Sequence, residues 1–493
     1  MLRSNLALLV RPGEIVKNLI LAFLLLPSLL VAQARSVLPK SLILTHVTVI
    51  DATGSPAKPD MTVEIREHRI IAIDRTSALP PNDTEIVDAT GKFLIPGLWD
   101  MHVHTGRGDV FFPLYIVNGV TGVRDMGGDL EDPSGELSSL SARYVQLSLW
   151  REAIEKGSLL GPRIVMAGFL IDGFKWPGNI AATNAEEGHE AVDVLKRIGV
   201  DFIKVKSFLS RDVYLSIAAE AQRQHIVLAG HVPDAVRAAE ASDNGQKSIE
   251  HLTGIALGCS AAESQLMDEK RQAFAARDRA RYDRIEARAT ESFDADVAST
   301  LFRTFVRNGT WQVPTLVELR RNALGDIGTR PTQDSAKDDP RWAYLPVSLR
   351  DWWSKSRSGT VPDGGQELFN GQLSLVRGMH RSGVFFMAGT DSPNPSILPG
   401  FALHDELKLL VSTGFTPMEA LQAATLNPAR YLGKQKDLGT IETGKFADLV
   451  LLDANPLDDI SNTQKIRAVI VNGRYLGREQ LDAMLAGVQA VAK

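Results

Sequence analysis

Short apolar runs alternate with amphipathic stretches along the middle of the chain, and this alternation restricts the fold more than any other feature. The apolar runs lie around His102 and at 122–125, 162–167, 202–205, 226–231, 249–251, 312–315 and 384–389, and helical patterns include 191–198, 213–224 and 368–380. Strands that alternate with helices indicate βα units around a parallel sheet, and eight such units can close a barrel. We therefore predict an α/β fold with a (β/α)8 TIM barrel over residues 96–430.

Both ends of the chain are rich in strand-like patterns instead. Candidate strands lie at 42–45, 47–50, 62–65 and 69–73, and again at 447–452 and 466–471, where the turn Asn472-Gly473 follows. Such runs bounded by turn residues are typical of β-strands. We predict that residues 35–95 and 431–493 fold together into one small β-sandwich domain.

Two segments of the middle region exceed normal loop length. The first, 259–300, is rich in Arg, Ala, Asp and Glu and predicts a solvated helix. The second, 318–365, carries the aromatic residues Trp342, Tyr344, Trp352 and Trp353. In a barrel these loops emerge on the catalytic face, so the second insertion is either an aromatic lid or a segment whose aromatic residues pack it onto the barrel rim.

The N-terminus has the pattern of an export signal. Three basic residues (Arg3, Arg11 and Lys17) precede an apolar run at 19–31, and Ala32-Gln33-Ala34 resembles a signal peptidase site. The run is shorter than the ~20 residues of a comfortable membrane span. We predict a signal peptide at 1–34, a secreted or periplasmic protein, and no stable membrane association after cleavage; an uncleaved anchor is the alternative.

Charge and cysteine content exclude some functions. The net charge of −5 is modest and spread along the chain, so nothing favours nucleic acid as a partner. Cys259 is the only cysteine, and no intrachain disulfide can form. Stability must therefore come from burial. The oligomeric state is left open by the sequence, a homo-oligomer included.

Two histidines lie two residues apart at the end of the first barrel strand. Side chains alternate faces along a strand, so His102 and His104 point the same way. Two imidazoles on one face can present their nitrogen lone pairs to one Zn²⁺, Mn²⁺, Fe²⁺ or Co²⁺ ion. Hydrogen bonding inside a core is the alternative for such a short motif.

Further candidate ligands follow at the ends of later strands. The whole set is His102, His104, Lys204, His231, His251 and Asp391. Catalytic groups of such barrels come from several strand ends on one face, so these side chains would converge and could hold two metal ions. Structural alternatives are core histidines, a lysine paired with an acid, and an aspartate that caps a helix. Arg124 and Asp125 end the second strand, where we expect a structural ion pair at the rim rather than a substrate contact.

The combination of motifs resembles the amidohydrolase superfamily of metal-dependent hydrolases, and within it the imidazolonepropionase-like and Xaa-Pro dipeptidase branch. The motifs are IPGLWDMHVH at 95–104, GVDFIKV at 199–205, GHVP at 230–233, IEH at 249–251, AGTDS at 388–392, TPMEAL at 416–421, NPA at 427–429 and GTIETGKFADLV at 439–450. The resemblance extends over nearly all of residues 41–475.

This resemblance implies a role for each candidate. His102, His104 and Asp391 would bind the more buried metal ion, and His231 and His251 the more exposed one. Lys204 would bridge the two ions, and since an ammonium group has no lone pair, it would have to carry a carbamate formed with CO₂. Lys206 is the rival on the same face. The metal would be zinc, with manganese, iron and cobalt as alternatives, and Asp391 would also transfer the proton.

The function expected from these residues is that of an exported metal-dependent amidohydrolase, which uses metal-activated water to cleave an amide or related C–N bond. A dipeptide or an N-acyl amino acid is the preferred substrate, although residues 169–176 lack the Gly-Gly-His segment of many prolidase-like relatives. Alternatives are a cyclic-amide hydrolase, deaminase, lactonase or phosphotriesterase, or a non-catalytic binding protein. The sequence does not identify residues that bind the substrate.

Overall fold

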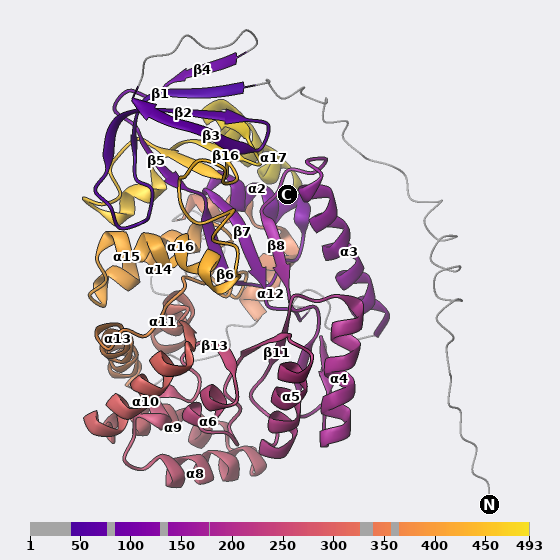
Figure 1. Ribbon diagram of the computed structural model, residues 1–493. Helices are drawn as coiled ribbons and strands as arrows, with labels where there is room; N and C mark the ends of the chain where they lie inside the picture. Colours follow the sequence, from indigo (N-terminus) through magenta and orange to yellow (C-terminus); the bar gives the residue numbers. More distant parts are fainter. Residues whose placement is uncertain are drawn as a thin grey trace, which may run out of the picture. The chain divides into compact units, whose positions relative to one another are not determined.

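The chain alternates strands and helices through its middle, which confirms the predicted α/β class (Figure 1). The computed structural model describes residues 41–75, 84–128, 137–176, 178–325, 339–355 and 364–492, without the side chains of 137–143 and 355. The predicted signal peptide lies outside these residues. No helix of the described part combines the length and the apolar character needed to cross a membrane.

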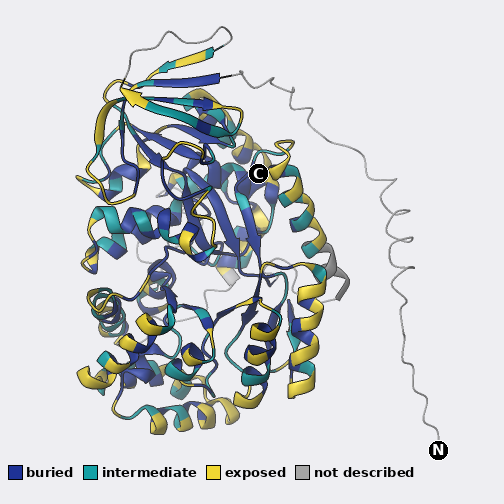
Figure 2. Cartoon of the chain, viewed as in Figure 1, coloured by how far each residue is buried: buried dark blue, intermediate teal, exposed yellow. Residues whose placement is uncertain are grey.

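The parallel strands of the middle region lie in two sheets. A three-stranded sheet has the order β6 (Leu98–Val103), β7 (Val120–Asp125) and β8 (Arg163–Met166). A six-stranded sheet has the order β10 (Asn179–Ala181), β9 (Leu170–Asp172), β11 (Phe202–Val205), β12 (Val227–Gly230), β13 (Gln246–Glu250) and β14 (Trp311–Val313). Seven of the eight predicted strands are therefore present. Every residue of β6 and β7 is buried (Figure 2).

The eighth predicted strand, at 384–389, is wrong as a regular strand. This segment runs between β14 and β6 but forms only the isolated bridges of Phe386 with Gln312 and, beyond it, of Ser392 with Val103. Some of its backbone groups bond to Gln312 of β14 and Met101 of β6. Others have partners outside these strands: the amide of Ala388 donates to the carbonyl of Ala423, and the side chain of Asn427 donates to the carbonyl of Phe386. The strand pairing does not by itself close a barrel within the described residues.

A mixed sheet joins strands from both ends of the chain. Its order is β17 (Arg474–Gly477), β16 (Ile466–Val471), β15 (Leu449–Leu452), β5 (Phe93–Pro96), β1 (Ser41–Val49), β2 (Lys58–Arg66) and β3 (Arg69–Arg75), and β4 (Thr84–Asp88) pairs with β1. The pairing gives one continuous sheet and does not confirm a sandwich. Beyond β5, Gly97 donates its amide to Asp448 and the chain continues as β6.

Two local features of this sheet follow from single residues. The predicted strands at 42–45 and 47–50 are one strand, β1, whose register shifts between Leu44 and Val47. His46 lies there with a φ of 57°, which accommodates the irregularity. At the other end, Asn472 and Gly473 have φ values of 49° and 77°, as a tight turn between two antiparallel strands requires.

Helix boundaries agree with capping residues in the sequence. In α4 (Ala185–Ile198), Asn184 accepts a hydrogen bond from the amide of Glu187, and Gly199 ends the helix with a φ of 85°. In α5 (Arg211–Arg223), Ser210 caps in the same way. The helix predicted at 368–380 is α13 (Gly365–Arg381).

The first insertion is a pair of helices rather than one solvated helix. α8 (Glu263–Ala275) and α9 (Arg279–Glu291) are separated where Asp278 caps the second helix by accepting from the amide of Arg281. Lys270 is buried between them and its ammonium group lies 3.1 Å from Glu286. The charged composition therefore supports an ion pair inside the helix pair as well as a solvated face.

The aromatic residues of the second insertion pack inward. The described parts are η2 (Pro340–Tyr344) and α12 (Val347–Lys355). Trp342 and Trp353 are buried, with ring centroids 5.3 Å apart, and the indole of Trp353 donates to the carbonyl of Pro393 at 2.8 Å. These contacts favour the packing alternative over a lid.

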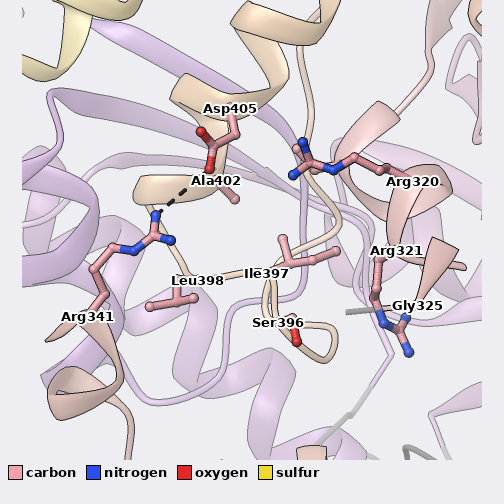
Figure 3. A pocket seen from close by; sticks show the side chains of 10 residues that line it. Arg320, Arg321, Gly325, Arg341, Ser396, Ile397, Leu398, Ala402 and Asp405 are labelled. Carbon is pink, nitrogen blue, oxygen red and sulfur yellow. Dashed lines mark ion pairs between the residues drawn. The ribbon is translucent and has the colours of Figure 1, made fainter. Parts of the chain in front are cut away.

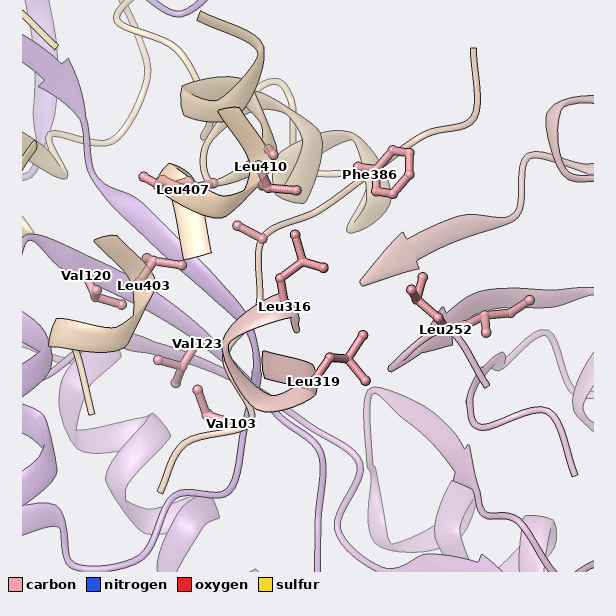
Figure 4. Packing of buried hydrophobic residues seen from close by; sticks show 14 of the residues in the cluster. Val103, Val120, Val123, Leu252, Leu316, Leu319, Phe386, Leu403, Leu407 and Leu410 are labelled. Atoms are coloured by element: carbon pink, nitrogen blue, oxygen red, sulfur yellow. The ribbon is translucent and has the colours of Figure 1, made fainter. Parts of the chain in front are cut away.

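A hydrophobic core fixes the helices that follow the last strands. α11 (Leu316–Leu324) begins directly after β14, and α14 (Phe401–Ser412) packs beside it (Figure 4). Leu316 and Leu319 of α11 share a core cluster with Leu403, Leu407 and Leu410 of α14. This packing holds the loop between residues 389 and 400 close to the strand ends.

A substitution at Gly122 tests how closely β7 packs against β6. A Cβ atom at this position would lie 2.2 Å from the Trp99 ring, so Gly122→Ala should lower the free energy of unfolding by about 1–3 kcal/mol. Gly487→Ala is the matched control in α17 (Arg478–Val491), because nothing lies within 4 Å of its added Cβ atom. The control should be neutral or stabilising by about 0.5–1 kcal/mol. Equal denaturation midpoints for both variants would contradict the packing.

Candidate active site

The four predicted histidines form a row of imidazole rings at the ends of the strands. Ring centroids are 5.5 Å apart between His104 and His102, 4.4 Å between His102 and His251, and 5.1 Å between His251 and His231. His102 lies in β6, while the other three directly follow β6, β12 and β13. Residues far apart in the sequence thus meet at one edge of the parallel strands.

Lys204 and Asp391 complete the cluster. The ammonium nitrogen of Lys204, in β11, lies 3.2 Å from Nε2 of His102. Oδ1 of Asp391 lies 3.1 Å from Nε2 of His104 and 3.4 Å from Nε2 of His102, and Oδ2 lies 3.8 Å from Nε2 of His251. The structure therefore brings all six predicted side chains together.

Each histidine ring is held through its other nitrogen, Nδ1. The partners are the carboxylate of Glu250 for His102 at 2.8 Å, the carbonyl of Gly127 for His104, the hydroxyl of Ser207 for His231 at 2.8 Å, and the hydroxyl of Thr315 for His251 at 2.7 Å. A carboxylate and a carbonyl can only accept, so His102 and His104 donate from Nδ1. Their Nε2 atoms therefore keep the lone pair that faces the cluster.

This donor set fits a divalent metal ion. The Nε2 atoms of His102 and His104 and Oδ1 of Asp391 are all acceptors, yet they face one another at little more than 3 Å, an arrangement that a shared cation stabilises. Nε2 of His231 and Oδ1 of Asp391 are buried without a hydrogen-bond partner in the described residues. Ligand atoms of His102, His251 and Asp391 lie within 4.8 Å of one another. This group combines one histidine from each of the two ion sites expected from the sequence, His102 from the first and His251 from the second.

Burial sets the charge state of the cluster. It lowers the pKa of His102 and His231 well below the usual range and that of His251 to about 3, so these imidazoles are neutral near pH 7. Burial, and secondarily the charge of Lys206, lowers the pKa of Lys204 to about 7. For Asp391, burial alone would raise the pKa, but His251, His104 and Lys204 outweigh it and hold the pKa below its usual range.

A buried ion pair supports His102 from behind. Both Glu250 oxygens accept from Arg124 at 2.9 Å, and both side chains are fully buried. Ser248 donates to Glu250 at 2.6 Å, and Arg124 also donates to the carbonyl of Met101. The ion pair of Arg124 is structural, as expected, but its placement at the rim is wrong: Arg124 lies in the core, and its carboxylate partner is Glu250 of β13.

Other supporting residues were missed by the sequence reasoning. Oδ2 of Asp100 accepts from the Thr390 hydroxyl at 2.6 Å, and Oδ1 accepts from the amide of Thr390 at 3.0 Å, which ties the residue before Asp391 to β6. His251, Thr315 and Asp391 all have positive φ values, between 48° and 64°. Strained backbone of this kind concentrates at functional sites and could not be recognised in residues other than glycine from sequence alone.

Lys206, the rival lysine, packs against an aromatic ring instead, although its charge acts on Lys204 and His231. Its ammonium nitrogen is 5.1 Å from the centroid of the Trp176 ring, and the side chain is half-buried. Lys204 is the lysine that contacts a histidine. Cys259 is fully buried, and burial raises the pKa of its thiol to about 12, in agreement with a structural role.

A cavity of about 370 Å³ opens beside α11 and α14 (Figure 3). Its lining includes Arg320, Arg321, Arg341, Ser396 and Asp405. Arg321 donates to Glu318, whose pKa is raised to about 7 by burial and by the charge of Asp391.

Comparisons with known proteins agree with the geometry in indicating a hydrolase. A sequence model of the Amidohydrolase family matches residues 93–476. The chain is 24% identical to the ochratoxinase of Aspergillus niger over 475 residues, which cover 85% of this chain and 83% of the relative. It is 44% identical over 80 residues to the imidazolonepropionase of Shouchella clausii, or 16% of this chain and 18% of the relative. The crystal structure of a Xaa-Pro dipeptidase has a TM-score of 0.60 at 20% identity, covering 89% of this chain and all of that one.

Separate alanine substitutions distinguish the two lysines. Lys204→Ala should lower metal affinity by about 100-fold and abolish most activity, because Lys204 lies among the histidines. Lys206→Ala should keep most of both. Metal content after dialysis and hydrolysis rates provide the measurements, and the opposite pattern would identify Lys206 as the ligand.

Glu250→Gln tests the support of His102. The amide keeps the shape but lacks the charge that balances Arg124 and orients the imidazole, so we expect metal affinity to fall about 10–100-fold. Competition with a chelating dye measures this affinity. Glu479→Gln, at an exposed position in α17, is the control and should not change it. Unchanged affinity in both variants would show that the ion pair serves stability alone.

Proposed function

This chain belongs to the amidohydrolase family and is a hydrolase that acts on carbon–nitrogen bonds of small molecules; from that premise we propose that it is an exported, metal-dependent amidohydrolase. The observation that carries the proposal is the convergence of four imidazole Nε2 atoms, Asp391 and Lys204, with acceptors that face each other 3.1 Å apart. Hydrogen bonding alone leaves such acceptors uncompensated, whereas a cation stabilises them.

We assign the ligands as follows. His102, His104 and Asp391 hold one ion, and His231 and His251 hold a second. Lys204 would contribute an anionic ligand to the same site as a carbamate. Zinc is the preferred metal because imidazole and carboxylate ligands suit it, with manganese, iron and cobalt as alternatives.

The residues then divide the reaction among them. Divalent ions at this site supply Lewis-acid activation of water and of the amide carbonyl. Asp391 accepts a proton from the attacking water and gives it to the leaving nitrogen, so that the C–N bond breaks to an acid and an amine. Glu250 and Thr315 keep His102 and His251 oriented during these steps.

The preferred substrate is a dipeptide or an N-acyl amino acid. The structural neighbour named Xaa-Pro dipeptidase supports a dipeptide, and the sequence relative named ochratoxinase supports hydrolysis of an amide bond.

The finer architecture belongs to the same proposal. Residues 96–430 close a (β/α)8 barrel, and the bridges at Phe386 and Ser392 support closure between β14 and β6. Residues 35–95 and 431–493 form the small β domain, supported by a separate apolar cluster that includes Leu44, Val63 and Leu449. Export rests on the signal pattern at 1–34.

A substrate panel tests the function. Purified protein is assayed with dipeptides, N-acyl amino acids, lactones and phosphotriesters, before and after chelation and with added Zn²⁺ or Mn²⁺. We expect hydrolysis of an amide substrate that chelation abolishes and metal restores, and Asp391→Asn should lower kcat by about 10²–10⁴-fold. Faster cleavage of lactones or phosphotriesters would reassign the substrate class. Fewer than one ion per chain without hydrolysis would indicate a binding protein.

A further inference from the structure

Four aromatic side chains surround a second cavity, of about 510 Å³. This aromatic cup consists of Phe174, Phe208, Phe274 and Tyr282. Phe174 follows β9, Phe208 follows β11, Phe274 lies in α8 and Tyr282 in α9. Two loops of the catalytic face and both helices of the first insertion therefore contribute to one cavity.

Three rings of the cup pack against one another, and two of them remain partly exposed. Phe208 and Phe274 are stacked with centroids 4.4 Å apart and planes at 21°, and Phe174 lies 5.3 Å from Phe208. Phe174 and Phe274 remain 43% and 45% exposed. They are two of the four exposed phenylalanines among the described residues, so exposed aromatic surface is concentrated here.

Polar contacts hold the walls of the cup in place. Oδ1 of Asp172 accepts from the amides of Gly173 and Phe208, both at 2.9 Å. The hydroxyl of Tyr282 donates to Asp234 at 2.5 Å, and Asp234 also pairs with the buried Lys270 at 3.0 Å. A preformed apolar cavity with a few fixed polar groups is the usual form of a small-molecule site.

The cup shares its loops with the catalytic cluster. Ser207 contacts Nδ1 of His231 at 2.8 Å, and Phe208 is the next residue. Asp234, which anchors Tyr282, lies three residues after His231 and donates its amide to the carbonyl of Ser207. The loop that carries Ser207 and Phe208 therefore contacts the catalytic cluster and also forms one wall of the cup.

We propose that the aromatic cup binds an aromatic ring of the substrate, carried on the acyl or the amine side of the amide bond that is cleaved. The inference rests on the proposed function and specifies its substrate class. Stacking against Phe274 and Phe174 uses the ring surface that the protein leaves exposed, which an aliphatic group would fill less well.

Matched substrates test the cup. Wild-type protein, Phe274→Ala and the control Phe293→Ala are assayed with N-acetyl-phenylalanine, N-benzoyl-alanine and N-acetyl-alanine. Phe293 is 49% exposed in the same insertion but does not line the cup. In Phe274→Ala we expect KM to rise about tenfold for at least one ring-bearing substrate, with kcat within about twofold and N-acetyl-alanine unchanged. The two ring-bearing substrates distinguish the acyl from the amine side.

A binding measurement makes the result independent of catalysis. Calorimetric titration of benzoate, with acetate as the blank, should show affinity about tenfold weaker for Phe274→Ala than for Phe293→Ala. Phe274→Leu replaces Phe274→Ala if circular dichroism shows that the latter is unfolded.

The outcomes separate the two proposals. If wild-type protein hydrolyses none of the substrates, the proposed function fails, while benzoate binding still decides the cup. Equal effects on all three substrates, or unchanged benzoate affinity, would overturn the cup. So would a dimer of the wild-type protein that Phe274→Ala dissociates, because the cup would then bind a second copy of the chain.

Discussion

The buried ion pair between Arg124 and Glu250 is the interaction on which the cluster of histidines depends. Both groups are fully buried, and charges removed from water are tolerated only when they are paired and hydrogen-bonded. Glu250 meets this condition with Arg124, Ser248 and His102. The pair therefore fixes which nitrogen of His102 carries the proton, and through it the direction in which the free lone pair points.

The same principle repeats around the site with different atoms. A carbonyl orients His104, and hydroxyl groups orient His231 and His251. Asp391 has no regular strand beneath it, yet Asp100 fixes the preceding residue to β6. Side-chain hydrogen bonds thus hold the site rigid where the hydrogen bonding of the sheet is incomplete. This rigidity keeps the acceptor atoms of His102, His104 and Asp391 close together although they do not attract one another directly.

Sequence periodicity was sufficient to predict seven parallel strands and to place His102 and His104 on one face, because the two-residue repeat of a strand depends on local geometry alone. It was insufficient at 384–389, where Ala423 and Asn427 compete for backbone groups from far along the chain. The pairing of Arg124 with Glu250 was not predicted for a related reason: the two residues lie far apart in the sequence, and only the three-dimensional structure brings them together. In the first insertion, the second helix begins at a capping residue, Asp278, which the charged composition of the segment did not reveal.

The direct passage from β5 through Gly97 into β6 has a consequence for the order of events during synthesis. β5 pairs with β15, which lies more than 350 residues later, and β15 in turn needs β16. Contacts of such sequence separation form late, since they carry a large loop-closure cost. The strand that bears His102 follows β5 directly and also bonds to Ala424, so we expect it to gain its full support only once the C-terminal region has been synthesised, and a C-terminally truncated chain to lack an ordered centre.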